Sequence, residues 1–256
     1  MTKSKPKKSI LRTSLEVCLM LVLVFFAILV SELIVAWIMA LILGDKADQP
    51  LPLAIFSALS YVLAIVIIIW LPPFIKAKRE KSPKALVSRA ELGLHGYLTW
   101  TDVGLSLVGF VAYFVLASAL TALFSSLMPW FDASEAQEVG FNVHSSGIDR
   151  LIAFFALVVV APIAEEVIFR GWLYGKMRAK LTGVMPNVYS VIISTILTSL
   201  AFGLVHMQWN VGVNVFAMSI VLCLMREVTG TIYADILVHM LKNGIAFYLL
   251  FILGIS

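Results

Sequence analysis

Two adjacent glutamates and an arginine follow a strongly apolar run of the chain. Glu165 and Glu166 come directly after LIAFFALVVVAPIA (151–164), and Arg170 stands one helical turn beyond Glu166. Residues four apart share a helix face, so Glu166 and Arg170 can form an internal ion pair. Consecutive helical residues are rotated by about 100°, so we expect Glu165 to point elsewhere and not into the same site as Glu166. A carboxylate without a local partner suits the role of a general base.

Two later apolar segments carry polar side chains at the same spacing. In AFGLVHMQWN, Phe202 and His206 are four apart, so we expect the two rings to pack on one face. In VHMLKNGIAF, His239 and Asn243 are four apart and share a face as well. Asp235, one turn before His239, is expected either to orient that imidazole or to lie at the membrane interface.

A single histidine or asparagine in an apolar helix is more often an interhelical hydrogen-bonding residue than a ligand. One glutamate, two histidines and one asparagine on three helices differ from such a single residue, because together they offer several ligands. Imidazole and oxygen donors both suit zinc. Such a set can hold a divalent metal or polarise a water molecule. The spacing alone leaves the structural and the catalytic interpretation open.

Composition places these residues in a membrane protein. The 256 residues are 61% hydrophobic and only 13% charged, about half the charged fraction of a typical soluble domain. The net charge of +4 does not indicate nucleic-acid binding, because the basic residues stand in blocks between apolar runs. The two cysteines lie within apolar runs without metal-binding spacing, so we interpret them as packing residues.

The hydropathy pattern predicts an all-α, polytopic integral membrane protein. About seven apolar segments are long enough to approach or span a bilayer, and an eighth is left open. The segments are 15–43, 51–75, 103–128, 151–169, 188–207, 211–225 and 231–253.

Lysine and arginine fall almost entirely on one side of this arrangement. Sixteen of them lie in the amino-terminal tail, the 76–89 loop, the segment after the fourth span and the end of the sixth span. On the other side are only Lys46 and Arg150. The positive-inside rule therefore predicts a cytoplasmic amino terminus. We divide the chain into an amino-terminal part (1–100), with the tail, two spans and the basic loop, and a second domain (101–256) that carries the polar motifs.

The three polar motifs, taken in order, resemble a known family. EEVIFR matches an EExxxR pattern, FGLVH matches FxxxH, and HMLKN matches HxxxN. This trio resembles the CAAX proteases and bacteriocin-processing enzymes, the CPBP or Abi-domain intramembrane metalloproteases. The resemblance runs from about 103 to 253, and SRAELGLHG (88–96) is similar to the short loop before the family's domain. Each motif alone is weak, but the ordered trio is specific.

The resemblance implies a role for each motif residue. Glu165 would activate the attacking water, while His206, His239 and Asn243 would coordinate a metal, such as zinc, or stabilise the oxyanion of the tetrahedral intermediate. Whether a metal is required stays open, because a glutamate–histidine pair could act directly on water. The other motif residues would shape the site: Glu166, Arg170 and Phe202.

The function we expect is that of an intramembrane endopeptidase acting on a membrane-associated protein or peptide, in a bacterial cell membrane. The alternative is a non-proteolytic binding partner with the same fold, such as a bacteriocin self-immunity protein or a signalling regulator. A transporter with a proton relay is less favoured, because the sequence lacks paired half-repeats and broken helices. The expected partners are the substrate and the lipid bilayer, without nucleic acid, and the oligomeric state is left open.

Overall fold

The computed structural model describes residues 9–80 and 87–255, and all the regular structure in these ranges is helical. The elements are α1 (Ile10–Leu43), η1 (Gly44–Lys46), α2 (Pro50–Ile65), η2 (Val66–Trp70), α3 (Leu71–Glu80), α4 (Trp100–Leu127), α5 (Gly147–Phe154), η3 (Phe155–Val160), α6 (Ala161–Glu166), η4 (Val167–Tyr174), α7 (Gly175–Leu181), α8 (Asn187–Leu204), α9 (Trp209–Thr229), α10 (Tyr233–Phe247) and η5 (Tyr248–Leu253).

Seven helical segments in the described ranges are long and apolar enough to cross a membrane, which confirms the expected all-α polytopic fold. They are Ile10–Lys46, Pro50–Arg79, Trp100–Leu127, Gly147–Leu181, Asn187–Leu204, Trp209–Thr229 and Tyr233–Leu253. The orientation of the amino terminus stays a prediction. The lysines of residues 1–8, together with Lys81 and Lys84, contributed to the charge count and lie outside the described residues.

The outer surface of the bundle is apolar, as contact with lipid requires. On α1, Phe26 and Leu33 are each 60% exposed, whereas Ala27 and Ser31 of the same helix are fully buried. Small residues at helix contacts let the backbones approach closely, and large apolar side chains face the bilayer. Within lipid a helix also satisfies its own backbone hydrogen bonds.

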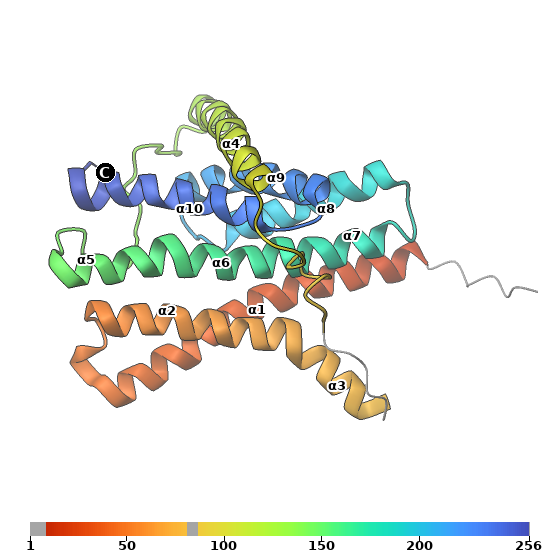
Figure 1. Ribbon diagram of the computed structural model, residues 1–256, viewed down its shortest axis with the longest axis horizontal. Helices are drawn as coiled ribbons and strands as arrows, with labels where there is room; N and C mark the ends of the chain where they lie inside the picture. Colours follow the sequence, from red (N-terminus) through yellow and green to blue (C-terminus); the bar gives the residue numbers. More distant parts are fainter. Residues whose placement is uncertain (1–8, 81–86, 256) are drawn as a thin grey trace, which may run out of the picture.

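The span Gly147–Leu181 lies in the middle of the bundle (Figure 1). It consists of α5, η3, α6, η4 and α7 without a break, and it packs on α1 and α2 on one side and on α8 and α10 on the other. In its most apolar stretch 44% of the residues are buried, compared with 17% for α4. Polar side chains near its centre are therefore shielded from lipid.

The helix carrying the two glutamates has irregular winding. α6 contains Pro162 and is flanked by π-helical turns, η3 before it and η4 after it. Proline cannot donate the backbone hydrogen bond of a regular turn, and π-helical turns occur frequently at functional sites. The wider winding changes the angular relation between Glu166 and the residues that follow it.

A close contact between α8 and α9 positions the turn that contains His206. A Cβ atom added at Gly203 would lie 2.9 Å from the carbonyl oxygen of Gly212, so only glycine permits this approach. The turn also holds Met207 at a φ of 54°, a left-handed conformation that is strained for a side chain of this size. His206 thus lies just beyond the end of α8, and not within the helix as the sequence pattern predicted.

The segment before α4 packs on the span Gly147–Leu181, called the central span below. Glu91 and Leu92 lie in a turn that begins at Ser88, whose hydroxyl accepts a hydrogen bond from the Glu91 amide at 3.2 Å. Leu92 is buried against Gly171, where an added Cβ would lie 2.9 Å from the Leu92 carbonyl oxygen. Lys176 forms an ion pair with Glu91. The boundary near residue 100 stays a prediction, and helices on both sides of it pack together.

Candidate active site

The expected ion pair between Glu166 and Arg170 is present and fully buried. Arg170 Nη1 donates to Glu166 Oε1 at 2.8 Å, and both side chains are 0% exposed. The guanidinium carbon of Arg170 also lies 4.3 Å from the centroid of the Phe202 ring. A buried charge is costly unless it is paired, so this pair joins the central span to α8 through the cation–π contact.

His239 lies between the two adjacent glutamates. Its Nδ1 is 2.8 Å from Glu166 Oε1, and its Nε2 is 3.7 Å from Glu165 Oε2. The expectation that Glu165 and Glu166 cannot serve one site is therefore wrong. Their side chains do leave the helix in different directions, but an imidazole ring carries nitrogens on two sides and both carboxylates reach it.

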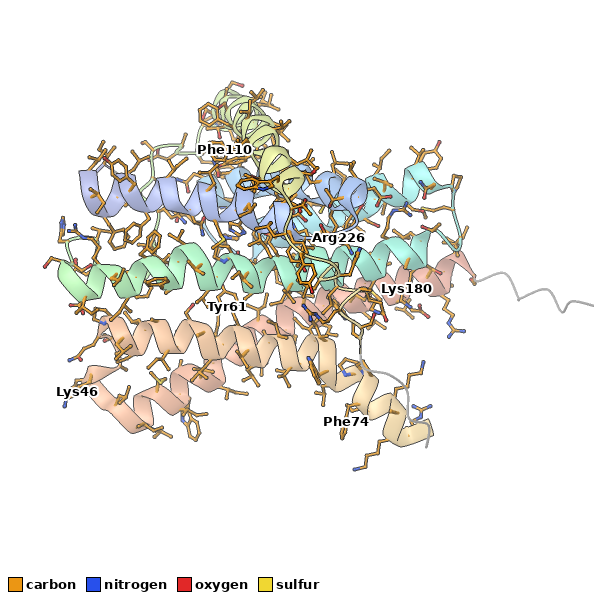
Figure 2. The ribbon with its side chains drawn as sticks, in the orientation of Figure 1. Lys46, Tyr61, Phe74, Phe110, Lys180 and Arg226 are labelled. Atoms are coloured by element: carbon orange, nitrogen blue, oxygen red, sulfur yellow. The ribbon has the colours of Figure 1, made fainter. Side chains whose placement is uncertain are left out.

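Glu165 has a second partner that the motifs did not indicate. The phenol of Tyr61 on α2 donates a hydrogen bond to Glu165 Oε1, and Tyr61 lies between α2 and the central span (Figure 2). Because Tyr61 occupies Oε1, the other carboxylate oxygen, Oε2, faces His239. The sequence offered one signal for this residue: the segment 51–75 contains a single tyrosine and otherwise only apolar residues and two serines.

The other imidazole is also held by its Nδ1 atom. His206 Nδ1 lies 2.8 Å from the carbonyl oxygen of Phe202. A carbonyl oxygen can only accept, so Nδ1 carries the proton and the Nε2 of a neutral ring keeps its lone pair. Glu165 and His239 lie within electrostatic range of His206.

Phe202 connects these groups through its ring. Its centroid lies 5.0 Å from that of His206 and 5.8 Å from that of His239, with both imidazoles in edge-to-face orientation. The expected packing of Phe202 and His206 on one face is confirmed. Phe202 is fully buried, so its ring closes the side of the site that faces Arg170 and keeps both imidazoles in place.

Asn243 occupies the edge of the cluster. Its Nδ2 donates to the carbonyl oxygen of Leu157 in η3 at 2.8 Å. Among the described residues, the structure brings Glu165, Glu166 and His239 into direct contact, while Asn243 contacts the backbone of the central span and not these side chains. The amide retains a second N–H and its carbonyl oxygen for other partners.

Asp235 differs from both alternatives that the sequence suggested. It does not orient His239, because Glu166 occupies the Nδ1 atom of that ring. It is also not interfacial, because the side chain is 0% exposed. Both carboxylate oxygens are buried without a hydrogen-bonding partner among the described residues. In the described part of the chain, no hydrogen bond therefore joins Asp235 to Glu165, His206 or His239.

The donor types at this site suit a divalent metal. Both imidazoles have Nδ1 bonded to an oxygen and Nε2 available, which is the usual arrangement of histidines that bind metals. However, no group of three or more His, Cys, Asp and Glu side chains in the described part of the chain is arranged to hold a metal. A metal here would therefore need Asn243 or a non-protein ligand to complete its coordination.

The buried carboxylate–imidazole cluster inside the helical bundle is the candidate active site, and it lies in the part of the chain that matches known proteins. Residues 147–245 match the model of the family described as type II CAAX prenyl endopeptidase Rce1-like. This segment contains every motif residue discussed above, from Glu165 to Asn243.

A curated relative supports the same family. The chain is similar to the membrane-embedded CAAX protease MroQ of Staphylococcus aureus (strain USA300), with 29% identity over 93 residues. The similar region covers 36% of this chain and 37% of the relative. No solved structure matches the chain significantly. Together the two matches confirm the resemblance to the CPBP/CAAX protease family and support a membrane protease at the level of the family.

Proposed function

We propose that this chain is an intramembrane endopeptidase that hydrolyses a peptide bond of a membrane-associated protein or peptide. The observation that carries the proposal is the distance of 3.7 Å between Glu165 Oε2 and His239 Nε2 inside the bundle. A carboxylate and an imidazole at this separation can both reach one water molecule. The family match supports the reaction class.

In the proposed reaction, Glu165 is the general base. Tyr61 fixes Oε1, so Oε2 takes a proton from water as the water oxygen attacks the carbonyl carbon of the peptide bond. When the tetrahedral intermediate collapses, the C–N bond breaks and Glu165 returns the proton to the leaving amine. In a reaction without a metal, the free N–H of Asn243, and His206 when it is protonated, would stabilise the oxyanion.

His239 is oriented by its other nitrogen. The Glu166 carboxylate accepts from Nδ1, which sets the ring plane and directs Nε2 toward Glu165. Arg170 in turn holds Glu166. In this proposal Glu166 and Arg170 are positioning residues that do not touch the substrate.

We also propose a divalent metal, such as zinc, as a cofactor held by His206, His239 and Asn243. It would supply Lewis-acid chemistry, because a divalent cation polarises a carbonyl group and acidifies water. The two available Nε2 atoms support this assignment.

We infer that the end of the bundle with Lys176, Arg178 and Lys180 faces the cytoplasm of a bacterial cell, in line with the excess of basic residues there. The substrate would be a membrane protein or a membrane-bound peptide, because Glu165 and His239 lie on spans that pack together inside the bundle.

The proposal can be tested with cells that express the wild type or the variants Glu165→Gln, His206→Ala and His239→Ala at equal levels. Membrane proteomics and analysis of secreted peptides should show a cleavage product that all three variants lose. If the variants produce the same products as the wild type, proteolysis is the wrong function. A phenotype that persists in all three would favour the non-proteolytic binding partner.

A further inference from the structure

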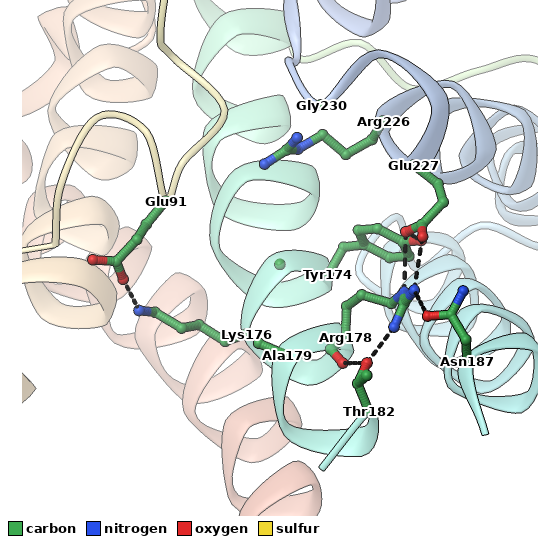
Figure 3. Close-up of a pocket in the computed structure, with 11 residues that line it drawn as sticks. Glu91, Tyr174, Lys176, Arg178, Ala179, Thr182, Asn187, Arg226, Glu227 and Gly230 are labelled. Carbon is green, nitrogen blue, oxygen red and sulfur yellow. Dashed lines mark hydrogen bonds and ion pairs between the residues drawn. The ribbon is translucent and has the colours of Figure 1, made fainter. Parts of the chain in front are cut away.

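A polar pocket lies at the basic end of the bundle, apart from the candidate active site (Figure 3). Its volume is about 610 Å³. It is lined by α7 and the residues next to both of its ends, by the end of α9, the start of α8 and the turn that contains Glu91. Three of its lining residues are basic and two are acidic: Lys176, Arg178, Arg226, Glu91 and Glu227.

Two of the three basic residues are neutralised within the pocket. Arg178 binds Glu227 with two hydrogen bonds, from Nε to Oε2 at 3.0 Å and from Nη2 to Oε1 at 2.8 Å. Lys176 forms an ion pair with Glu91, and this pairing lowers the pKa of the Glu91 carboxyl group below its usual value. Glu91 is therefore ionised at neutral pH, and its charge balances that of Lys176.

Arg226 is different. Among the described residues no hydrogen bond satisfies its guanidinium, and its Nε is buried without a partner. Figure 3 shows its side chain extending along the pocket without an interaction to the other residues drawn. Asp235 lies within electrostatic range of Arg226, yet its oxygens accept none of the guanidinium's hydrogens.

The loop before α4 leaves room for this guanidinium. Gly93 has a φ of +70°, and a Cβ atom there would lie 2.7 Å from the Arg226 guanidinium carbon. The amide of Ile232, just before α10, donates to the Gly93 carbonyl oxygen at 3.1 Å and fixes the loop at this place. A half-buried arginine with free donors thus lies in a fixed cradle beside a polar cavity.

The position of the pocket along the spans indicates which kind of anion it would bind. The span Gly147–Leu181 ends here, Asn187–Leu204 begins here, and Trp209–Thr229 ends here. Side chains at the ends of spans lie at the depth of the lipid headgroups. The planar fork of arginine matches phosphate oxygens with two parallel hydrogen bonds.

We propose that this pocket binds the phosphate group of an anionic membrane lipid, with Arg226 as its direct ligand. A lipid headgroup and an inorganic phosphate ion both present a phosphate anion, so inorganic phosphate could accept from the same donors. The proposal does not depend on the proteolytic activity.

The test uses the full chain in neutral detergent and measures its thermal unfolding while phosphatidylglycerol, phosphatidylcholine or inorganic phosphate is added. Phosphatidylglycerol should raise the unfolding temperature of the wild type saturably, and phosphatidylcholine should not. Arg226→Gln should weaken the apparent affinity for phosphatidylglycerol roughly tenfold or more, because a charge-assisted contact is lost. Lys180→Gln is the matched control: Lys180 lies at the same end but outside the pocket, and its variant should bind like the wild type.

Three results would overturn the proposal. They are equal stabilisation by both lipids, an unchanged response of Arg226→Gln, and stabilisation by inorganic phosphate without any by phosphatidylglycerol. If Arg226→Gln does not fold, Arg226→Lys takes its place. It keeps the charge but loses the fork, so it should bind phosphatidylglycerol several-fold more weakly than the wild type, and unchanged binding would count against a direct contact.

Discussion

Glu166 and His239 are joined by a hydrogen bond of 2.8 Å between Oε1 and Nδ1, although 73 positions separate them in the chain. The same carboxylate oxygen accepts from Arg170. One buried glutamate therefore fixes an arginine on its own helix and an imidazole on α10, and it connects the stability of the bundle with the geometry of the candidate site.

Replacing Glu166 should destabilise the fold. Glu166→Gln keeps the size of the side chain but removes the charge, and it leaves the Arg170 guanidinium buried without a counter-ion. Loss of one partner of a buried ion pair costs about 3–5 kcal/mol, so thermal unfolding in detergent should occur at a clearly lower temperature. Glu165→Gln, whose side chain is 15% exposed, is the control and should unfold near the wild-type temperature. Equal stability of all three proteins would contradict the structural role of Glu166.

Tyr61 should matter for activity more than for stability. Tyr61→Phe removes only the hydroxyl that donates to Glu165, so the carboxylate loses its fixed orientation. A hydrogen bond to a charged group contributes about 1.5–3 kcal/mol, and the cleavage rate should fall roughly tenfold to hundredfold. Tyr113→Phe, which removes a hydroxyl bound to Asn214 at 2.8 Å, is the matched control and should cleave normally. Equal cleavage rates for the two variants would show that Tyr61 has no part in the candidate active site.

A tightly packed glycine contact should control the position of His206. Gly203→Ala places a methyl group 2.9 Å from the Gly212 carbonyl oxygen, so α8 and α9 must move apart. Overpacking of this kind costs about 1–3 kcal/mol, and both the unfolding temperature and the cleavage rate should fall. Gly104→Ala on α4, where an added Cβ meets nothing within 4 Å, should behave like the wild type or be slightly more stable. The idea fails if Gly203→Ala keeps full activity.

Metal removal tests the proposed cofactor. If His206, His239 and Asn243 hold a divalent metal, the purified protein should contain about one metal ion per chain. A chelator should then abolish cleavage, and added zinc should restore it. Metal content should drop in His206→Ala but not in Tyr61→Phe, whose hydroxyl contacts only the glutamate. If the protein keeps full activity after its metal is removed, the metal is not required, and the direct glutamate–histidine mechanism is the one that remains.

The fold was largely predictable from the sequence. Long apolar runs must form helices in lipid because their backbone groups have no other partners, so the seven spans followed from hydropathy. Local spacing also predicted correctly what lies within one helical turn, namely the Glu166–Arg170 ion pair and the contact between the Phe202 and His206 rings.

Contacts between distant helices were harder to predict. Tyr61 and Glu165 are 104 positions apart, and no spacing rule connects them. Helical geometry predicted correctly that Glu165 and Glu166 point in different directions. It could not show that one imidazole fills the space between the two carboxylates. The burial of Asp235 depends on how α10 packs, which the composition of that segment did not reveal.

The central claim is that Glu165 activates a water molecule inside the bundle. The most direct measurement reconstitutes the purified wild type and Glu165→Gln in lipid nanodiscs with a substrate peptide identified by proteomics, in water enriched in heavy oxygen. Mass spectrometry then follows the new carboxyl terminus. The wild type should release a product whose new carboxyl group carries heavy oxygen, and Glu165→Gln should form it about 10²–10⁴ times more slowly. Cleavage by Glu165→Gln at the wild-type rate would contradict the account.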